Sequence, residues 1–231
     1  MCTSWKDAYQ TYDWTVDLSE FSNAANYAGY FDRIIGPGDT IEFESAFRTA
    51  VNEDEKSTSF AVAGEVCFWK NYGSHKSRNR RTQALLDHLE PEGNWRKFAE
   101  SIRAMANNPS HVAFHTLSNA CGQPYGFATP LTFLAFYDPA KYPMVDQYVG
   151  DWWKAHKAEF GFGDSEDFSQ RNDGVIQSNI QSLEAYFAWT RFCRDYAVRV
   201  ARNCKMNWRA RDVEIAVWQA QRKGLVLHKL P

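Results

Sequence analysis

The stretch GFATPLTFLAFYDPAKYPMVD, residues 126–146, predicts a tight loop, a short apolar helix, a turn and an aspartate at the next helix start. Gly126 and Ala128 allow the backbone to approach another group closely, because they carry little or no side chain. Thr129 is a suitable N-cap, and Pro130 at the first helical position removes no hydrogen bond that the helix needs. We therefore expect a helix from residue 130, whose first amides offer an anion site of phosphate size.

The second half of this stretch leads to an aspartate at the start of another helix. Asp138-Pro139 closes the apolar helix, because a residue that precedes proline avoids helical angles. After Tyr142-Pro143, apolar residues recur at helical spacing from Val145 onward. Asp146 is expected in the first turn of this helix, where the helix dipole favours a carboxylate.

This order of hairpin, helix and aliphatic-Asp step resembles the helix-hairpin-helix DNA glycosylase superfamily. In that superfamily, the hairpin amides and a helix N-terminus hold a DNA phosphate, and the aspartate lines the pocket for an extruded base. The resemblance implies that Asp146 is the catalytic-type aspartate. It assigns the DNA-binding hairpin to Gly126, Phe127, Ala128 and Thr129.

Two further segments strengthen the resemblance, which runs loosely from about residue 60 to residue 220. YPMVD at 142–146 and RDVEIAVW at 211–218 resemble poorly characterised prokaryotic members more than the well-known repair enzymes. Bifunctional members carry a lysine nucleophile where this chain has Pro130, so the resemblance implies no Schiff-base lyase step. Ala128 replaces the second hairpin glycine, which weakens the expected grip on phosphate. The resemblance implies a monofunctional DNA N-glycosylase of base excision repair, or alternatively a non-catalytic module that binds nucleic acid or protein.

Composition indicates a folded, soluble chain. The 231 residues are 44% hydrophobic and 16% aromatic, which excludes disorder and allows a substantial core. No apolar run reaches membrane-spanning length, and MCTSWKDAYQ lacks the pattern of a signal peptide, so we expect a cytoplasmic protein, associated with the nucleoid if it binds DNA. The five scattered cysteines lack C-x-x-C spacing, so we expect reduced structural thiols, no metal and no cofactor.

Charge is distributed unevenly along the chain. The net charge is −2, but residues 1–60 hold eleven acidic and four basic side chains, whereas residues 191–231 hold ten basic and three acidic ones. Such polarity fits a basic face for DNA, and equally two lobes that attract each other. The sequence does not decide the oligomeric state.

Helical periodicity dominates, so the expected fold is all-α, a two-lobed glycosylase-like fold with no paired strands. We expect residues 1–231 to form a single helical unit of two lobes with a cleft between them and the chain ends packed together. One lobe would comprise residues 1–108 with the C-terminal helices 176–231, and the hairpin lobe would comprise residues 109–175. Expected helices include 42–51, 59–70, a stripe over 95–105, a helix capped by Ser110, a long helix near 176–203 and a last helix ended by Gly224.

A basic segment at residues 70–81 is the second candidate for DNA binding. It holds five Lys or Arg residues, one histidine and no acid, and Tyr72 could stack on an unpaired base. The alternative is a solvated turn before a helix at 83–89. The candidate DNA-binding side chains are Lys70, His75, Lys76, Arg78, Arg80 and Arg81.

Aromatic residues near Asp146 are candidates for the wall of a base pocket, because an extruded base needs a planar or apolar surface. The nominated residues are Tyr125, Tyr148 and Trp153. The arginines of the 176–203 helix do not follow one narrow stripe, so some must face solvent or pair with acids such as Asp195 and Asp212, and structural pairing is the favoured interpretation. His111 and His115 lack a third ligand at suitable spacing, so a metal site is not expected there.

Overall fold

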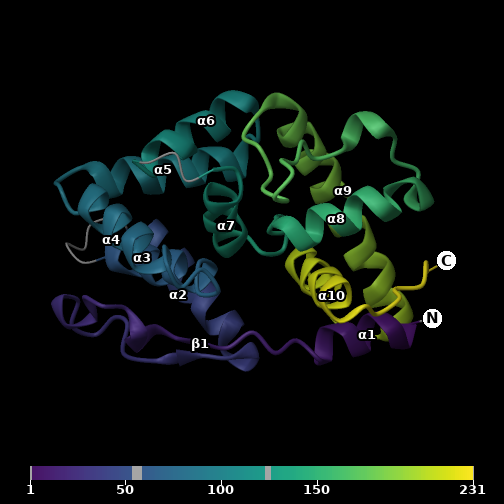
Figure 1. Ribbon diagram of the computed structural model, residues 1–231, viewed down its shortest axis with the longest axis horizontal. Helices are drawn as coiled ribbons and strands as arrows, with labels where there is room; N and C mark the ends of the chain where they lie inside the picture. Colours follow the sequence, from purple (N-terminus) through teal and green to yellow (C-terminus); the bar gives the residue numbers. More distant parts are fainter. Residues whose placement is uncertain (1, 54–58, 123–125, 231) are drawn as a thin grey trace. The chain divides into compact units, whose positions relative to one another are not determined.

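The computed structural model describes residues 2–53, 59–122 and 126–230, and helices dominate these ranges, which confirms the all-α prediction (Figure 1). The helices are α1 Cys2–Gln10, α2 Thr40–Asn52, α3 Phe60–Lys70, α4 Arg78–Leu89, α5 Asn94–Asn107, α6 His111–Ala120, α7 Ala128–Tyr137, α8 Gln147–His156, α9 Ile180–Cys204 and α10 Ala210–Lys223. Short 3-10 helices span residues 18–20, 24–26, 37–39, 157–160 and 164–166.

Local signals account for several helix boundaries. The Ser110 side chain caps α6 by accepting a hydrogen bond from the Ala113 amide at 3.2 Å, as expected. Gly224 ends α10 with a φ of +67°, also as expected. The long helix α9 begins later than predicted, because Asn179 caps it by accepting from the Ser182 amide, while Ile176 instead forms a bridge with Gln170.

One small sheet departs from the prediction of no paired strands. β1, Val16–Asp17, and β2, Ile34–Ile35, pair in antiparallel register, with Val16 opposite Ile35. The prediction was wrong here because two residues per strand are too few to produce a visible alternation of apolar and polar positions.

The chain divides into two compact units, each built from segments that are discontinuous in sequence. The α2–α6 unit comprises residues 13–125 and 132–137, and the α8–α10 unit comprises residues 1–12, 126–131 and 138–231. These boundaries differ from the expected lobes, because α6 packs on α5 within the first unit whereas α8 packs on α10 within the second.

Aromatic side chains from the second half of α7 lie at the centre of the α2–α6 unit. Phe133 stacks on Phe47 of α2 at a centroid distance of 5.8 Å and meets Phe98 of α5 edge-on at 5.0 Å. Phe136 meets Trp69 of α3 edge-on at 5.2 Å. Because α2, α3 and α5 all contact the apolar helix α7, their buried side chains form one common core around it.

The α8–α10 unit is built on an aromatic layer and on packing of the two chain ends. Trp153 of α8 lies 5.4 Å from Trp189 of α9, between ring centroids. The N-terminal helix α1 packs on α10 and α9, as Figure 1 shows near the two labelled termini. The fully buried Trp5 donates its indole hydrogen bond to the His228 carbonyl at 2.8 Å, so the ends are packed together as expected.

The close contact of α3 and α4 depends on the missing side chain of Gly64. A Cβ atom there would lie 2.6 Å from Leu86 Cδ2, so Gly64→Ala should lower the free energy of unfolding by about 1–2 kcal/mol, although alanine is the better helix former. Denaturant titration measures this loss. Combining it with Leu86→Ala should cost less than the sum of the single changes, and additive losses would contradict the proposed clash.

Candidate functional site

Asp146 caps the start of α8. Its backbone is extended, with a φ of −151°, and its Oδ1 atom accepts a hydrogen bond from the Val149 amide at 3.1 Å. This amide is one of those that the first turn of a helix leaves without an internal partner. The structure therefore places Asp146 one position before the expected first turn, with its half-buried carboxylate directed at the positive end of the helix.

Trp218 of α10 holds the other oxygen of this carboxylate. Its indole Nε1 donates a hydrogen bond to Asp146 Oδ2 over 2.9 Å, and both residues belong to the α8–α10 unit. The two carboxylate oxygens thus have separate donors on separate helices, which restricts rotation of the side chain. Our sequence analysis did not nominate Trp218. In the sequence, the one local indication of its role is that an indole N–H can only donate. Within an otherwise buried helix, this N–H requires an acceptor.

Further aromatic and cationic groups surround Trp218. Tyr12 and Tyr148 meet its ring edge-on at centroid distances of 5.8 and 5.9 Å, and the Arg222 guanidinium lies 5.0 Å from its centroid. Tyr148 is 43% exposed, so a large ring lies at the surface next to a fixed carboxylate. Such an arrangement can contact a planar group and stabilise positive charge close to it.

The predicted hairpin residues lie in the same unit as Asp146, but two of their side chains point into its core. Phe127 is 1% exposed and lies 6.3 Å from the rings of Phe168 and Tyr186, and Thr129 is also buried. Gly126 is exposed with a φ of +70°, a conformation that favours glycine. Any phosphate contact at this turn therefore depends on backbone groups rather than on those two side chains.

The remaining details of the hairpin differ in part from expectation. The helix begins at Ala128 rather than at residue 130, so Thr129 and Pro130 lie inside its first turn, and Ala128 is half-buried. Tyr125, a nominated base-pocket residue, lies outside the described residues.

Trp153 is a core residue, and its nomination for the base pocket is corrected accordingly. It is fully buried, donates its indole hydrogen bond to the Glu166 carbonyl at 2.8 Å, and packs 5.5 Å from the Phe192 ring. No face of this ring is accessible for stacking on a base. Tyr148, five positions earlier on α8, points to solvent because of its different phase on the helix.

The predicted basic segment is helical over its second part rather than a flexible loop. α4 begins at Arg78 instead of residue 83, and Arg78 is only 8% exposed. Its guanidinium pairs with Glu20 and lies 4.6 Å from the centroid of the Tyr72 ring. Because the Arg78 guanidinium interacts with a carboxylate and an aromatic ring of the same unit, its role is structural, and the DNA-binding prediction for Arg78 is corrected.

Other members of this segment are also engaged within the unit. Tyr72 donates its hydroxyl hydrogen to Glu20 Oε1 at 2.6 Å, and this hydrogen bond raises the pKa of Tyr72. Arg81 donates to Asn71 Oδ1 at 2.7 Å, and Lys70 forms the last residue of α3. The exposed basic side chains of the segment are His75, Lys76, Arg80 and Arg81.

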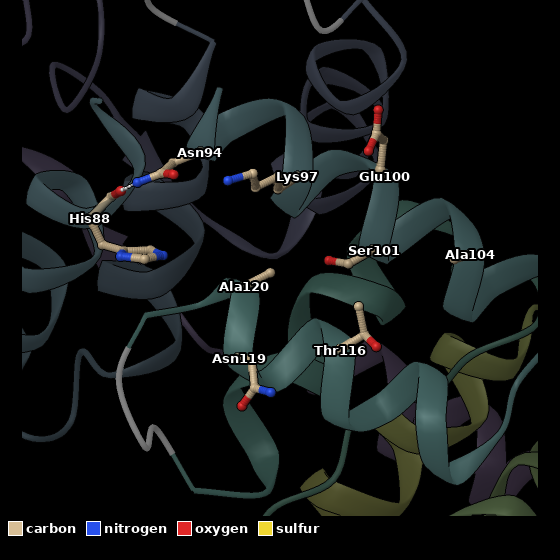
Figure 2. Close-up of a pocket in the computed structure, with 9 residues that line it drawn as sticks. All are labelled: His88, Asn94, Lys97, Glu100, Ser101, Ala104, Thr116, Asn119 and Ala120. Carbon is tan, nitrogen blue, oxygen red and sulfur yellow. Dashed lines mark hydrogen bonds between the residues drawn. The ribbon is translucent and has the colours of Figure 1, made fainter. Parts of the chain in front are cut away.

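A cavity of about 520 Å³ lies between α5, α6 and the end of α4, and none of the predicted site residues lines it (Figure 2). Lys97 points toward Asn94 and His88, whereas Glu100 points away from Ser101. The buried Ser101 hydroxyl donates to the Phe98 carbonyl at 2.7 Å. The Thr116 hydroxyl donates to the Val112 carbonyl at 2.9 Å, so both hydroxyls that line the cavity are engaged locally and neither is paired with a base.

The cysteines and histidines form no recognisable reactive centre in the described ranges. Cys67, Cys121 and Cys193 are buried thiols, and burial raises the pKa of Cys67 to about 12, which disfavours a thiolate. Cys204 is disulfide-bonded, so the expectation of reduced cysteines throughout was wrong at this position. Within the described residues, no three His, Cys, Asp or Glu side chains are placed to hold a metal ion.

Comparisons with protein-family models, curated protein sequences and solved structures find no match to this chain. Across the described ranges, no helix combines the length and hydropathy needed to cross a membrane. The geometry around Asp146 therefore carries the functional argument.

The cap at α8 can be tested by its effect on stability. Asp146→Ala removes the acceptor of the Val149 amide and should lower the free energy of unfolding by about 1 kcal/mol. Asp146→Asn keeps a capping oxygen and should cost less. Urea denaturation measures both variants, and equal stability of Asp146→Ala and wild type would argue against a capping contribution.

Glu20 makes the Arg78 cluster sensitive to acid. Hydrogen bonds from Tyr72 and then Arg78 lower the pKa of Glu20 below 4.5, so its stabilising contribution is present above that pH and lost as the pH falls through the lower value. Below pH 4.5, wild-type stability should therefore fall more steeply than that of Glu20→Gln. Thermal unfolding across this pH range measures the difference, and parallel curves would contradict it.

Proposed function

We propose that this protein binds DNA through a helix-hairpin-helix motif and removes a base as a monofunctional N-glycosylase. The observation that carries the proposal is the fixed carboxylate of Asp146, whose two oxygens accept hydrogen bonds from Val149 and Trp218. Cleavage of the bond between sugar and base develops positive charge on the sugar, and a carboxylate held in position stabilises that charge.

In the proposed reaction, water adds to the anomeric carbon of the sugar. The base departs with the electron pair of the glycosidic bond and takes up one proton, while the attacking water loses one and becomes the hydroxyl of the sugar. Asp146 stabilises the sugar cation and orients the attacking water. Pro130 stands where bifunctional members have their lysine, so the proposal includes no covalent enzyme intermediate.

The surface beside Asp146 supports recognition of a planar group. Tyr148 is the nominated base-pocket residue whose ring is exposed, and Trp218 lies edge-on to it. An extruded base is recognised in general by stacking and by contacts with its edge. Tyr148 therefore takes the role that the buried Trp153 cannot take.

A non-catalytic module that binds nucleic acid or protein is the second candidate. It is favoured by the fact that capping and core packing alone explain both hydrogen bonds of Asp146. In that case the protein would bind DNA without releasing a base, and its affinity would fall as salt concentration rises.

The discriminating experiment compares base release by wild type and Asp146→Asn from duplexes that each carry one damaged or mismatched base. We expect Asp146→Asn to bind the duplex but to release the base at least about 100-fold more slowly, because the charge that stabilises the sugar cation is lost. Equal release rates in both proteins would refute the assigned role of Asp146. Binding by wild type without release from any duplex would favour the second candidate.

Trp218→Phe supplies a matched variant, because phenylalanine keeps an aromatic ring but removes the donor to Asp146. It should lower kcat while leaving duplex affinity and KM largely unchanged. A change in affinity without a change in kcat would instead place Trp218 in DNA binding.

A further inference from the structure

The C-terminal half of α9 presents a row of cations to solvent. Five basic residues lie between positions 191 and 205, where Asp195 is the one acid, and all five are exposed. They are Arg191, Arg194, Arg199, Arg202 and Lys205. In a protein of net charge −2, this surface is therefore a local concentration of positive charge.

Packing of the opposite face of α9 fixes the direction of these side chains. Phe192, Tyr196 and Val200 are buried, which leaves the basic positions on the outer face of the same turns. The arginines thus share one broad exposed face rather than one narrow stripe, in agreement with their spacing in the sequence.

Most of these arginines lack the acidic partners that we expected. Asp212 pairs with Arg209 at 2.7 Å, and Arg191 pairs with Glu166 at 3.1 Å. Within the described part of the chain, Arg194, Arg199 and Arg202 form no salt bridge. Their charges are therefore not neutralised by ion pairs with described residues.

We infer that this face of α9 binds the phosphate backbone of a nucleic acid. The inference rests on the proposed function. It adds a second DNA-binding surface, separate from the hairpin. Arginine suits this role, because its planar guanidinium forms paired hydrogen bonds to phosphate oxygens. Arg194 and Arg202 are eight residues apart, or roughly 12 Å along the helix at about 1.5 Å per residue. That length corresponds to roughly three or four nucleotides of one DNA strand.

The composition of the face favours a nucleic acid over a membrane surface. Between residues 191 and 205, Val198 is the single exposed large apolar side chain. A helix that lies in a membrane interface needs a wide apolar face to insert between lipids. This face of α9 offers charge with almost no apolar area.

The test compares two triple variants with equal loss of charge, the first being Arg194→Gln, Arg199→Gln and Arg202→Gln. The control is Lys6→Gln, Arg96→Gln and Lys97→Gln, which removes three exposed cations elsewhere. Fluorescence anisotropy measures binding of a labelled DNA duplex over a range of salt concentrations. The slope of log affinity against log salt should become shallower by roughly 2 to 3 in the α9 variant, at about 0.9 per lost phosphate contact, and should keep its wild-type value in the control.

The outcomes separate this inference from the proposed function. Wild-type binding with an unchanged slope in the α9 variant overturns the inference and leaves the proposed function intact. A wild-type protein that binds no duplex overturns both. A shallower salt slope in the α9 variant, together with loss of base release in Asp146→Asn, supports both.

A second arm uses vesicles of phosphatidylserine and phosphatidylcholine. We expect little vesicle binding by wild type. Vesicle binding that only the α9 variant loses, with unchanged DNA binding, assigns the face to membranes and overturns the inference.

Discussion

Burial of α7 on all sides is the constraint on which the rest of the structure depends. Leu131, Phe133, Leu134, Ala135 and Phe136 are fully buried, so this helix has no polar face to offer to water. Its first residues count among the α8–α10 unit and its last six among the α2–α6 unit. In the α2–α6 unit, the last six residues of this helix are covered by α2, α3 and α5, which come from distant parts of the sequence.

In the candidate site, the orientation of Asp146 depends on a local cap and on a contact that is distant in sequence. Asp146 caps α8 through an amide three residues away, which any sequence with a suitable N-cap can achieve. Its second hydrogen bond comes from Trp218, 72 positions later in the chain. The orientation of the carboxylate therefore depends on the packing of α10 against α8, and the proposed chemistry depends on that packing as well.

Most features predicted correctly from the sequence are set by neighbouring residues. Ser110 and Gly224 act through the turn next to them, and helical periodicity depends only on near positions. The pairing of Arg78 with Glu20 spans 58 positions and produces no periodic pattern in the sequence. For this reason, the sequence alone assigned Arg78 to DNA binding. Trp153 and Tyr148 lie on opposite sides of α8, one buried and one exposed. The sequence does not distinguish them until it is known which side of the helix is buried.

The discontinuity of the α8–α10 unit has a consequence for folding during synthesis. Residues 13–137 are synthesised after α1 and before α8, α9 and α10. The contact of the buried Trp5 with the carbonyl of His228 forms only after residue 228 has been synthesised. Until α9, α10 and residue 228 have been synthesised, the buried side chains of α1, such as Trp5, therefore lack their native partners and are open to aggregation.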